Sequence, residues 1–125
     1  MAGLGRSLKK MTGFRSISWS DAVAYFGRFC PDHPILSLIR TIESEWESLV
    51  FPAGELGSIY LFDNPERESE TGFFVLEPKD NDREIKIAFV ESDGGLRTVE
   101  SFTVSYSEAR EELKRQLIKA GWINA

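Results

Sequence analysis

The clearest periodic pattern in the chain lies in residues 32–51, DHPILSLIRTIESEWESLVF. Apolar side chains recur there every three or four positions, which places them on one face of an α-helix of about 3.6 residues per turn. That face consists of Ile35, Ile39, Ile42, Trp46 and Leu49, with Leu36, Leu38 and Val50 widening it. Asp32 stands where an N-cap accepts backbone N–H bonds, and Pro34 falls in the first turn, where a missing N–H costs nothing. The pattern predicts an amphipathic helix with Trp46 anchored in the core.

A shorter helix is expected immediately before this one, in residues 21–29. Ser20 can cap it, and Val23, Phe26 and Phe29 fall on one face. The linker Cys30-Pro31-Asp32-His33-Pro34 ends it, because each proline disfavours helical geometry in the preceding residue. The two helices are therefore expected to form a hairpin or a corner.

After residue 51 the helical pattern gives way to short apolar runs. Residues 51–57, FPAGELG, contain proline and glycine and are interpreted as breakers. The runs that follow are rich in Ile, Val, Phe and Tyr, which suit a pleated surface, and they cover residues 58–62, 72–77, 84–91 and 96–106. The turns between them are short, and Asp93-Gly94-Gly95 is typical of a tight hairpin. Such connections join antiparallel neighbours, so the runs predict a meander.

A last helix is expected in residues 105–120. Ser105 and Glu108 have the spacing of a capping box, with Ser107 as an alternative cap. Gly121 is the expected residue after the helix, and it places Trp122 to fold back over the last turn. The buried stripe is predicted to contain Ala109, Leu113, Leu117 and Ala120.

Together these elements predict one α+β domain in the order α-α-β-β-β-β-α, a four-stranded antiparallel meander packed against helices. A chain of 125 residues that is 42% hydrophobic, with three Trp, three Tyr and nine Phe, can bury a core without disulfides or metal. Residues 1–18 are expected to form a basic, weakly amphipathic tail, and residues 19–125 an acidic domain.

The charges are unevenly distributed between these two parts. Before Asp21 there is no acidic residue but there are four basic ones, so residues 1–20 carry +4. Because the whole chain carries −5, the remaining residues carry −9. Nucleic acid is a poor partner for such a body, since binding phosphates requires clustered cations. A basic protein fits it better.

The sequence favours a cytoplasmic location. The single Cys30 cannot form an internal disulfide, and no apolar run approaches the roughly 20 residues of a membrane span. The start of the chain also lacks the apolar stretch of a secretory signal. Membrane-surface attachment through the tail is a less favoured alternative, because Leu4, Leu8, Met11 and Phe14 recur at near-helical spacing among basic residues while three glycines oppose a helix.

We predict no catalytic residue, cofactor site or metal site. Cys30 and His33 are the chain's only thiol and imidazole, but a zinc site needs about four ligands and none remains to complete it. Both are therefore interpreted as parts of an interhelical linker. Two series of glutamates spaced by two, one on a helix and one in a loop, are interpreted as solvated charge that could face a cationic partner: Glu43, Glu45 and Glu47, and Glu66, Glu68 and Glu70.

The central strands are apolar on both alternating faces, as in Ile59-Tyr60-Leu61-Phe62 and Phe73-Phe74-Val75-Leu76. Antiparallel sheets with one wet face alternate instead, so each face here must be covered by helices, by the tail or by another chain. We therefore expect a non-catalytic protein-binding module of the inhibitor, escort or scaffold type, most simply a homodimer formed through the sheet or its edge. The residues expected at the partner are Glu43, Glu47, Tyr60, Phe62, Glu66, Glu68, Glu70, Phe73 and Phe74. The alternative is a small-ligand or enzymatic site between the sheet and the helices.

Overall fold

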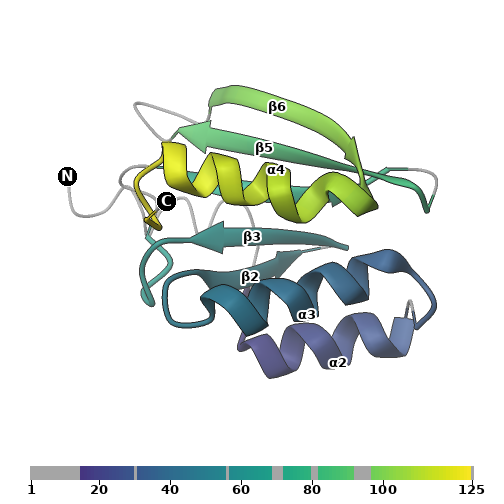
Figure 1. Cartoon of the computed structure of the whole chain (residues 1–125). Coiled ribbons are helices and arrows are strands. Elements are labelled where there is room, and N and C mark those ends of the chain that lie inside the picture. Colours follow the sequence, from purple (N-terminus) through teal and green to yellow (C-terminus); the bar gives the residue numbers. More distant parts are fainter. Residues whose placement is uncertain are drawn as a thin grey trace.

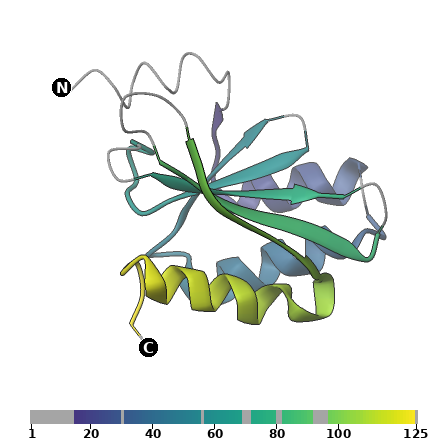
Figure 2. The same cartoon turned by 90° about the horizontal axis from the view of Figure 1, so that it is seen from above.

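The computed structural model describes residues 15–29, 31–55, 57–68, 72–79, 82–91 and 97–124. In this part of the chain an antiparallel sheet of six strands, in the order β1-β2-β3-β4-β5-β6, carries helices on one side (Figures 1 and 2). The elements are, in chain order, β1 (Arg15–Ser16), α2 (Trp19–Phe29), α3 (Pro34–Trp46), β2 (Phe51–Glu55), β3 (Ser58–Phe62), β4 (Phe73–Pro78), β5 (Glu84–Glu91), β6 (Arg97–Ser105) and α4 (Tyr106–Lys119).

The α+β class and the antiparallel meander are confirmed, but the prediction of four strands in a helix-first order is wrong. The described residues instead have the order β-α-α-β-β-β-β-β-α. The missed strand β2 contains Pro52 and Gly54, and it pairs with β3 from Phe51↔Phe62 to Glu55↔Ser58. The missed β1 pairs with β2 through Arg15↔Gly54 and Ser16↔Ala53. Residues 1–14 of the predicted tail lie outside the described residues.

Helix α3 is shorter than predicted at both ends. Its N-cap is His33, whose Nδ1 accepts the N–H of Ile35 at 3.1 Å, and not Asp32. At the other end, the N–H groups of Leu49 and Val50 both donate to the carbonyl of Trp46, at 2.9 Å each, and the chain turns away. Leu49 therefore lies beyond the helix and is 46% exposed, contrary to the prediction. The rest of the main stripe is buried as predicted: Ile35, Ile39, Ile42 and Trp46.

The ends of the other two helices agree with the predictions only in part. Helix α2 begins at Trp19, and Ser18 rather than Ser20 caps it, accepting the N–H of Asp21 at 3.0 Å. At the start of α4 the hydroxyl of Ser105 contacts the carboxylate of Glu108 and no backbone N–H. The end of α4 follows the prediction, since Gly121 has φ +80° and the N–H of Trp122 donates to the carbonyl of Leu117.

The main core fills the space between the sheet and the helices. The strands contribute one alternating set of residues, including Ile59, Leu61, Phe74 and Leu76. The helices contribute buried residues such as Phe26, Ile39 and Leu113, whereas Ala120, predicted to be buried, is exposed. Trp19 ties α2 to the connection after α3, because its Nε1–H donates to the buried carbonyl of Val50 at 3.1 Å. A smaller cluster, made of Ala53, Phe62, Phe73 and Val90, lies on the opposite set of strand positions. Both sheet faces are thus apolar in the central strands.

Candidate functional site

The predicted partner-binding residues are spread over several parts of the molecule. Phe74 belongs to the main core beneath the helices, whereas Tyr60, Phe62 and Phe73 lie on the opposite face of the sheet. Glu43 and Glu47 are at the end of α3, Glu66 and Glu68 are in the segment after β3, and Glu70 lies outside the described residues. The described members of the set therefore do not form one continuous surface.

Two of the aromatic residues on the far face are already buried. Phe62 is fully buried and Phe73 is 3% exposed, and their rings stack with centroids 5.2 Å apart. Tyr60 packs beside Phe73, with ring centroids 5.7 Å apart, and is half-buried. Buried side chains offer a partner little contact area, so of these three Tyr60 is the one placed to meet another chain.

Arg67 fixes the segment that carries Glu66 and Glu68. Its Nε–H donates to the carbonyl of Pro52 at 3.0 Å, and its Nη2 donates to the carbonyl of Ile17 at 2.7 Å. Burial lowers the pKa of Arg67, although an arginine stays charged at any physiological pH. Its backbone has φ +54°, a conformation that L-residues rarely adopt. Arg67 thus locks this segment against β2 and the residue after β1.

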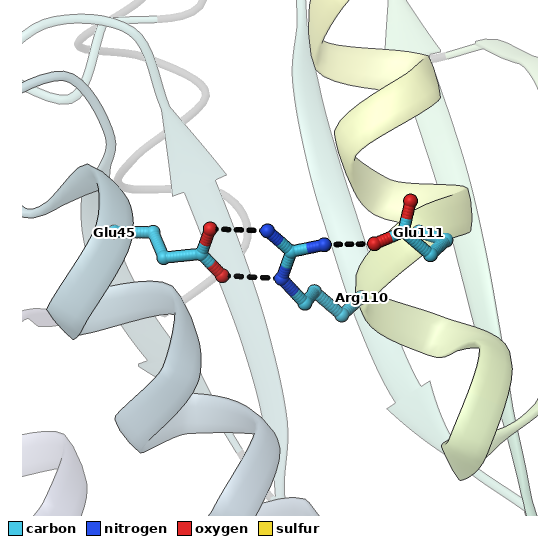
Figure 3. A network of polar contacts seen from close by, with 3 residues as sticks. All are labelled: Glu45, Arg110 and Glu111. Carbon is cyan, nitrogen blue, oxygen red and sulfur yellow. Dashed lines mark hydrogen bonds and ion pairs between the residues drawn. The ribbon is translucent and has the colours of Figure 1, made fainter.

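A charged cluster on the helical side joins α3 to α4 (Figure 3). The guanidinium of Arg110 donates two hydrogen bonds to the carboxylate of Glu45 and also contacts Glu111. The hydrogen bonds from Arg110 lower the pKa of Glu45, and those to Glu45 raise the pKa of Arg110. Arg110 is the only cation of this cluster and contacts both carboxylates, so the cluster keeps a net charge of −1. Its two hydrogen bonds to Glu45 join α3 to α4, which is a structural role.

The linker residues give no support for thiol or metal chemistry. Cys30 lies outside the described residues, and His33 caps α3 and packs its ring edge-on against Tyr106, with centroids 5.5 Å apart. Among the residues that the structure describes, no three His, Cys, Asp or Glu side chains gather as a metal site would require. No helix in that part of the chain is long and apolar enough to cross a membrane.

The first feature suited to a function is the free edge of β6. This strand is nine residues long and pairs only with β5 among the described strands. A register shift at Phe89/Val90 leaves Val99 as an extra residue, but the pairing is regular from Phe89↔Glu100 to Glu84↔Ser105. Figure 1 shows β6 at the outer margin of the sheet, with α4 over one face and no labelled element beyond it. No strand of the described residues pairs with its backbone groups on that side.

The second feature is a pocket of about 420 Å³ between the end of α4 and the sheet. Its aromatic lining comes from Phe74, Phe89 and Trp122, and the Trp122 ring meets Phe74 edge-on with centroids 5.0 Å apart. The remaining lining residues are Asp63, Val99, Glu100, Gln116, Lys119, Ala120 and Gly121. A volume of this size is typical of small-ligand sites.

The polar groups of the pocket differ in how far they are already satisfied. The ammonium of Lys119 donates to both oxygens of Glu100, at 2.8 and 3.0 Å. Gln116 is only 7% exposed, and its Nε2 donates to the carboxylate of Glu112 at 2.8 Å. Asp63 is exposed and accepts a hydrogen bond from the side chain of Asn64.

Sequence reasoning did not identify this pocket. The predicted alternative was a site between the sheet and the helices with no residues assigned to it, and this pocket lies between α4 and the sheet. The available signal was Gly121 followed by Trp122, which predicts an aromatic ring folded back over the helix end. The sequence could not show that this ring would meet Phe74 and Phe89, because that depends on the tertiary packing of α4 on the sheet.

Comparisons of the chain with protein-family models, with curated proteins and with solved structures find no match.

Proposed function

We propose that this protein is a non-catalytic binding module, of the inhibitor, escort or scaffold type, that accepts an extended segment of another protein at the free edge of β6. The observation that carries the proposal is the length and openness of this edge. Soluble proteins usually shorten, cover or charge a strand in this position, since its unpaired N–H and C=O groups can pair with another chain. Here nine residues contain no proline, and the described helices leave the edge open.

The side chains of β6 are also compatible with an added strand. Ser101 and Thr103 are exposed on the face away from the helices, while Phe102 and Val104 point towards the core and hold the strand in register. Strand addition gives affinity through the backbone, and neighbouring side-chain pairs add about 0.2–1 kcal/mol each. The partner would therefore have to supply an extended segment. This protein would not have to rearrange to bind it.

The charge supports a basic protein as the partner. The chain carries −5 overall, and residues 21–125 together carry −9. Long-range attraction would speed association with a cationic protein and oppose association with nucleic acid. A cytoplasmic location and a homodimer joined through β6 are the simplest versions of the proposal.

Peptide selection tests the proposal directly. A displayed library of random peptides longer than β6, selected against the full-length protein, supplies the probe. The Ser101→Lys/Thr103→Lys variant places charge beside the edge and should bind the selected peptides about tenfold more weakly. The control Ser37→Lys/Ser44→Lys adds the same charge at exposed positions of α3 and should bind as the wild type does.

Three outcomes would contradict the proposal: no peptide enriched, equal binding by the edge variant and the wild type, or equal weakening by both variants. The homodimer version is tested by sedimentation equilibrium of the wild type and the edge variant. A wild-type dimer that the edge variant converts to a folded monomer would support pairing through β6. A monomer at all concentrations would restrict the partner to a different protein.

The pocket supports a second candidate function, the binding of a small ligand between the sheet and the helices. Its lining combines three aromatic side chains with a few polar groups, as the lining of many small-ligand sites does. Attachment to a membrane surface through the tail is the least supported alternative, because residues 1–14 lie outside the described residues. Co-sedimentation of the full-length protein with anionic vesicles tests it.

A further inference from the structure

The residues that line the pocket beside α4 favour one kind of ligand, independently of the edge of β6. Three of its lining residues carry formal charge: Asp63, Glu100 and Lys119. Lys119 and Glu100 already satisfy each other through two hydrogen bonds. Asp63 is left as the uncompensated charge, so the pocket carries a net −1 in a protein that carries −5. The charge of the pocket and the charge of the whole protein both favour a cation over an anion as the ligand.

Gln116 adds an acceptor at the inner wall. The carboxylate of Glu112 can only accept hydrogen bonds, so it fixes which end of the Gln116 amide bears the donor. The Gln116 oxygen must then point away from Glu112, and no described residue donates to it. Gln116 as a whole is only 7% exposed, but its oxygen is not fully buried. A ligand that carries N–H donors would satisfy it.

The aromatic lining favours the same chemistry. The faces of Phe and Trp rings are negative and attract cations, most strongly when the site is partly desolvated. Trp122 meets both Phe74 and Phe89 edge-on, at centroid distances of 5.0 and 6.5 Å, and the three rings line one pocket. A flat cation on an apolar stem would place its stem on Val99 and these rings and its donors at Asp63 and Gln116.

We propose that this pocket binds a guanidinium or alkylammonium group attached to an apolar stem. Two kinds of molecule carry such a group: a free organic cation, and a protein that presents an arginine or lysine side chain. In either case Trp122 and Phe89 contact the stem, Asp63 pairs with the charge, and the Gln116 oxygen accepts an N–H. Lys119 stays paired with Glu100 and takes no part in binding.

The test compares three probes that share a stem: butylguanidinium, the neutral butylurea and the anionic pentanoate. Each is titrated into the full-length protein at constant ionic strength, with the NMR signals of the Trp122 indole N–H, the Gln116 amide and the Gly121 backbone N–H as reporters. Butylguanidinium should shift these signals at concentrations about fivefold lower than butylurea, and pentanoate should not shift them.

Two variants assign the effect to the pocket. Asp63→Asn should remove most of the preference for butylguanidinium over butylurea. Asp82→Asn, in the connection between β4 and β5, should leave this preference unchanged. Ala120→Phe fills the pocket from an exposed position without changing any charge and should abolish the shifts. Backbone NMR spectra confirm that each variant is folded.

Four results would overturn the inference: no shift with butylguanidinium, equal affinity for butylurea, tighter binding of pentanoate, or unchanged binding by Ala120→Phe. A fourth probe, N-acetyl-arginine N-methylamide, separates the two sources. If it binds more tightly than butylguanidinium and also shifts the backbone signals of β6, the pocket takes a side chain of another protein. If it binds no more tightly, the pocket takes a free cation.

Discussion

At the scale of single residues, the structure differs from the periodic pattern wherever a local hydrogen bond ends an element. Leu49 continues the apolar spacing of α3, yet the carbonyl of Trp46 accepts two N–H groups and closes the helix before it. His33 takes the cap that Asp32 was expected to supply. Asp32 and His33 can both cap a helix, and Leu49 could extend one. The outcome depends on backbone geometry that the sequence does not specify.

Trp46 and Leu49 make a matched pair for testing this boundary. Trp46 is 7% exposed in the main core, so Trp46→Ala should lower the free energy of unfolding by about 3–5 kcal/mol. Leu49→Ala should change it by no more than about 0.5 kcal/mol, because that side chain is 46% exposed. Urea unfolding followed by circular dichroism measures both. Similar losses from the two substitutions would mean that α3 extends further than described.

Two glycines are expected to respond in opposite ways to an added methyl group. At Gly72, with φ +109°, a Cβ would lie 2.6 Å from the carbonyl oxygen of Val90, so Gly72→Ala should lower the free energy of unfolding by about 2 kcal/mol or more. At Gly27, inside α2, a Cβ meets nothing within 4 Å, and Gly27→Ala should raise it by about 0.5–1 kcal/mol. Thermal unfolding of both variants checks the signs, and a neutral Gly72→Ala would contradict the tight approach of residue 72 to β5.

At the scale of elements, the strands with apolar composition were predicted to within a residue at each end, and the two with unsuitable composition were missed. Pro52 and Gly54 make β2 look like a turn. The strand nevertheless forms because β3 pairs along its whole length and β1 pairs with its centre. A Cβ on residue 54 would lie 3.3 Å from Ile17, so glycine there permits the close approach of β1. These are long-range effects, and local propensity cannot anticipate them.

The contact between α3 and α4 is expected to depend on pH. The pKa of Glu45 is lowered by its hydrogen bonds with Arg110, so the folded state favours the ionised carboxylate. The stability advantage of the wild type over Glu45→Gln should be fully present above the ordinary pKa of glutamate and disappear as the pH falls through the lower folded-state value. The effect should be small and should shrink with added salt, since the pair is exposed.

Unfolding midpoints of the wild type and Glu45→Gln between neutral and acidic pH measure this difference. Glu47→Gln is the control, because Glu47 is exposed just beyond α3 and forms no ion pair with a described residue. A difference between wild type and Glu45→Gln that persists unchanged at low pH would show that the charge of Glu45 is not its cause.

At the scale of the whole molecule, the sequence was sufficient for the α+β class and the meander, while the number of strands and the candidate site required the structure. The apolar character of both sheet faces was predicted from residues such as Tyr60 and Phe62, and the second cluster on the face away from the helices agrees with it. The pocket was not predictable, since Asp63, Phe89 and Trp122 are far apart in the chain. The pairing of β3, β4 and β5 and the packing of α4 on the sheet bring them together.

Amide hydrogen exchange of the full-length protein with a selected peptide would show whether β6 accepts a strand from another protein. In the free protein, alternate residues between Glu100 and Ser105 pair with β5 and should exchange slowly, while the N–H groups between them face outward and exchange fast. The account predicts that saturating peptide protects those outward N–H groups and leaves the pairing with β5 intact. Bound peptide that leaves them exchanging fast, with protection or shifts elsewhere, would contradict strand addition at β6.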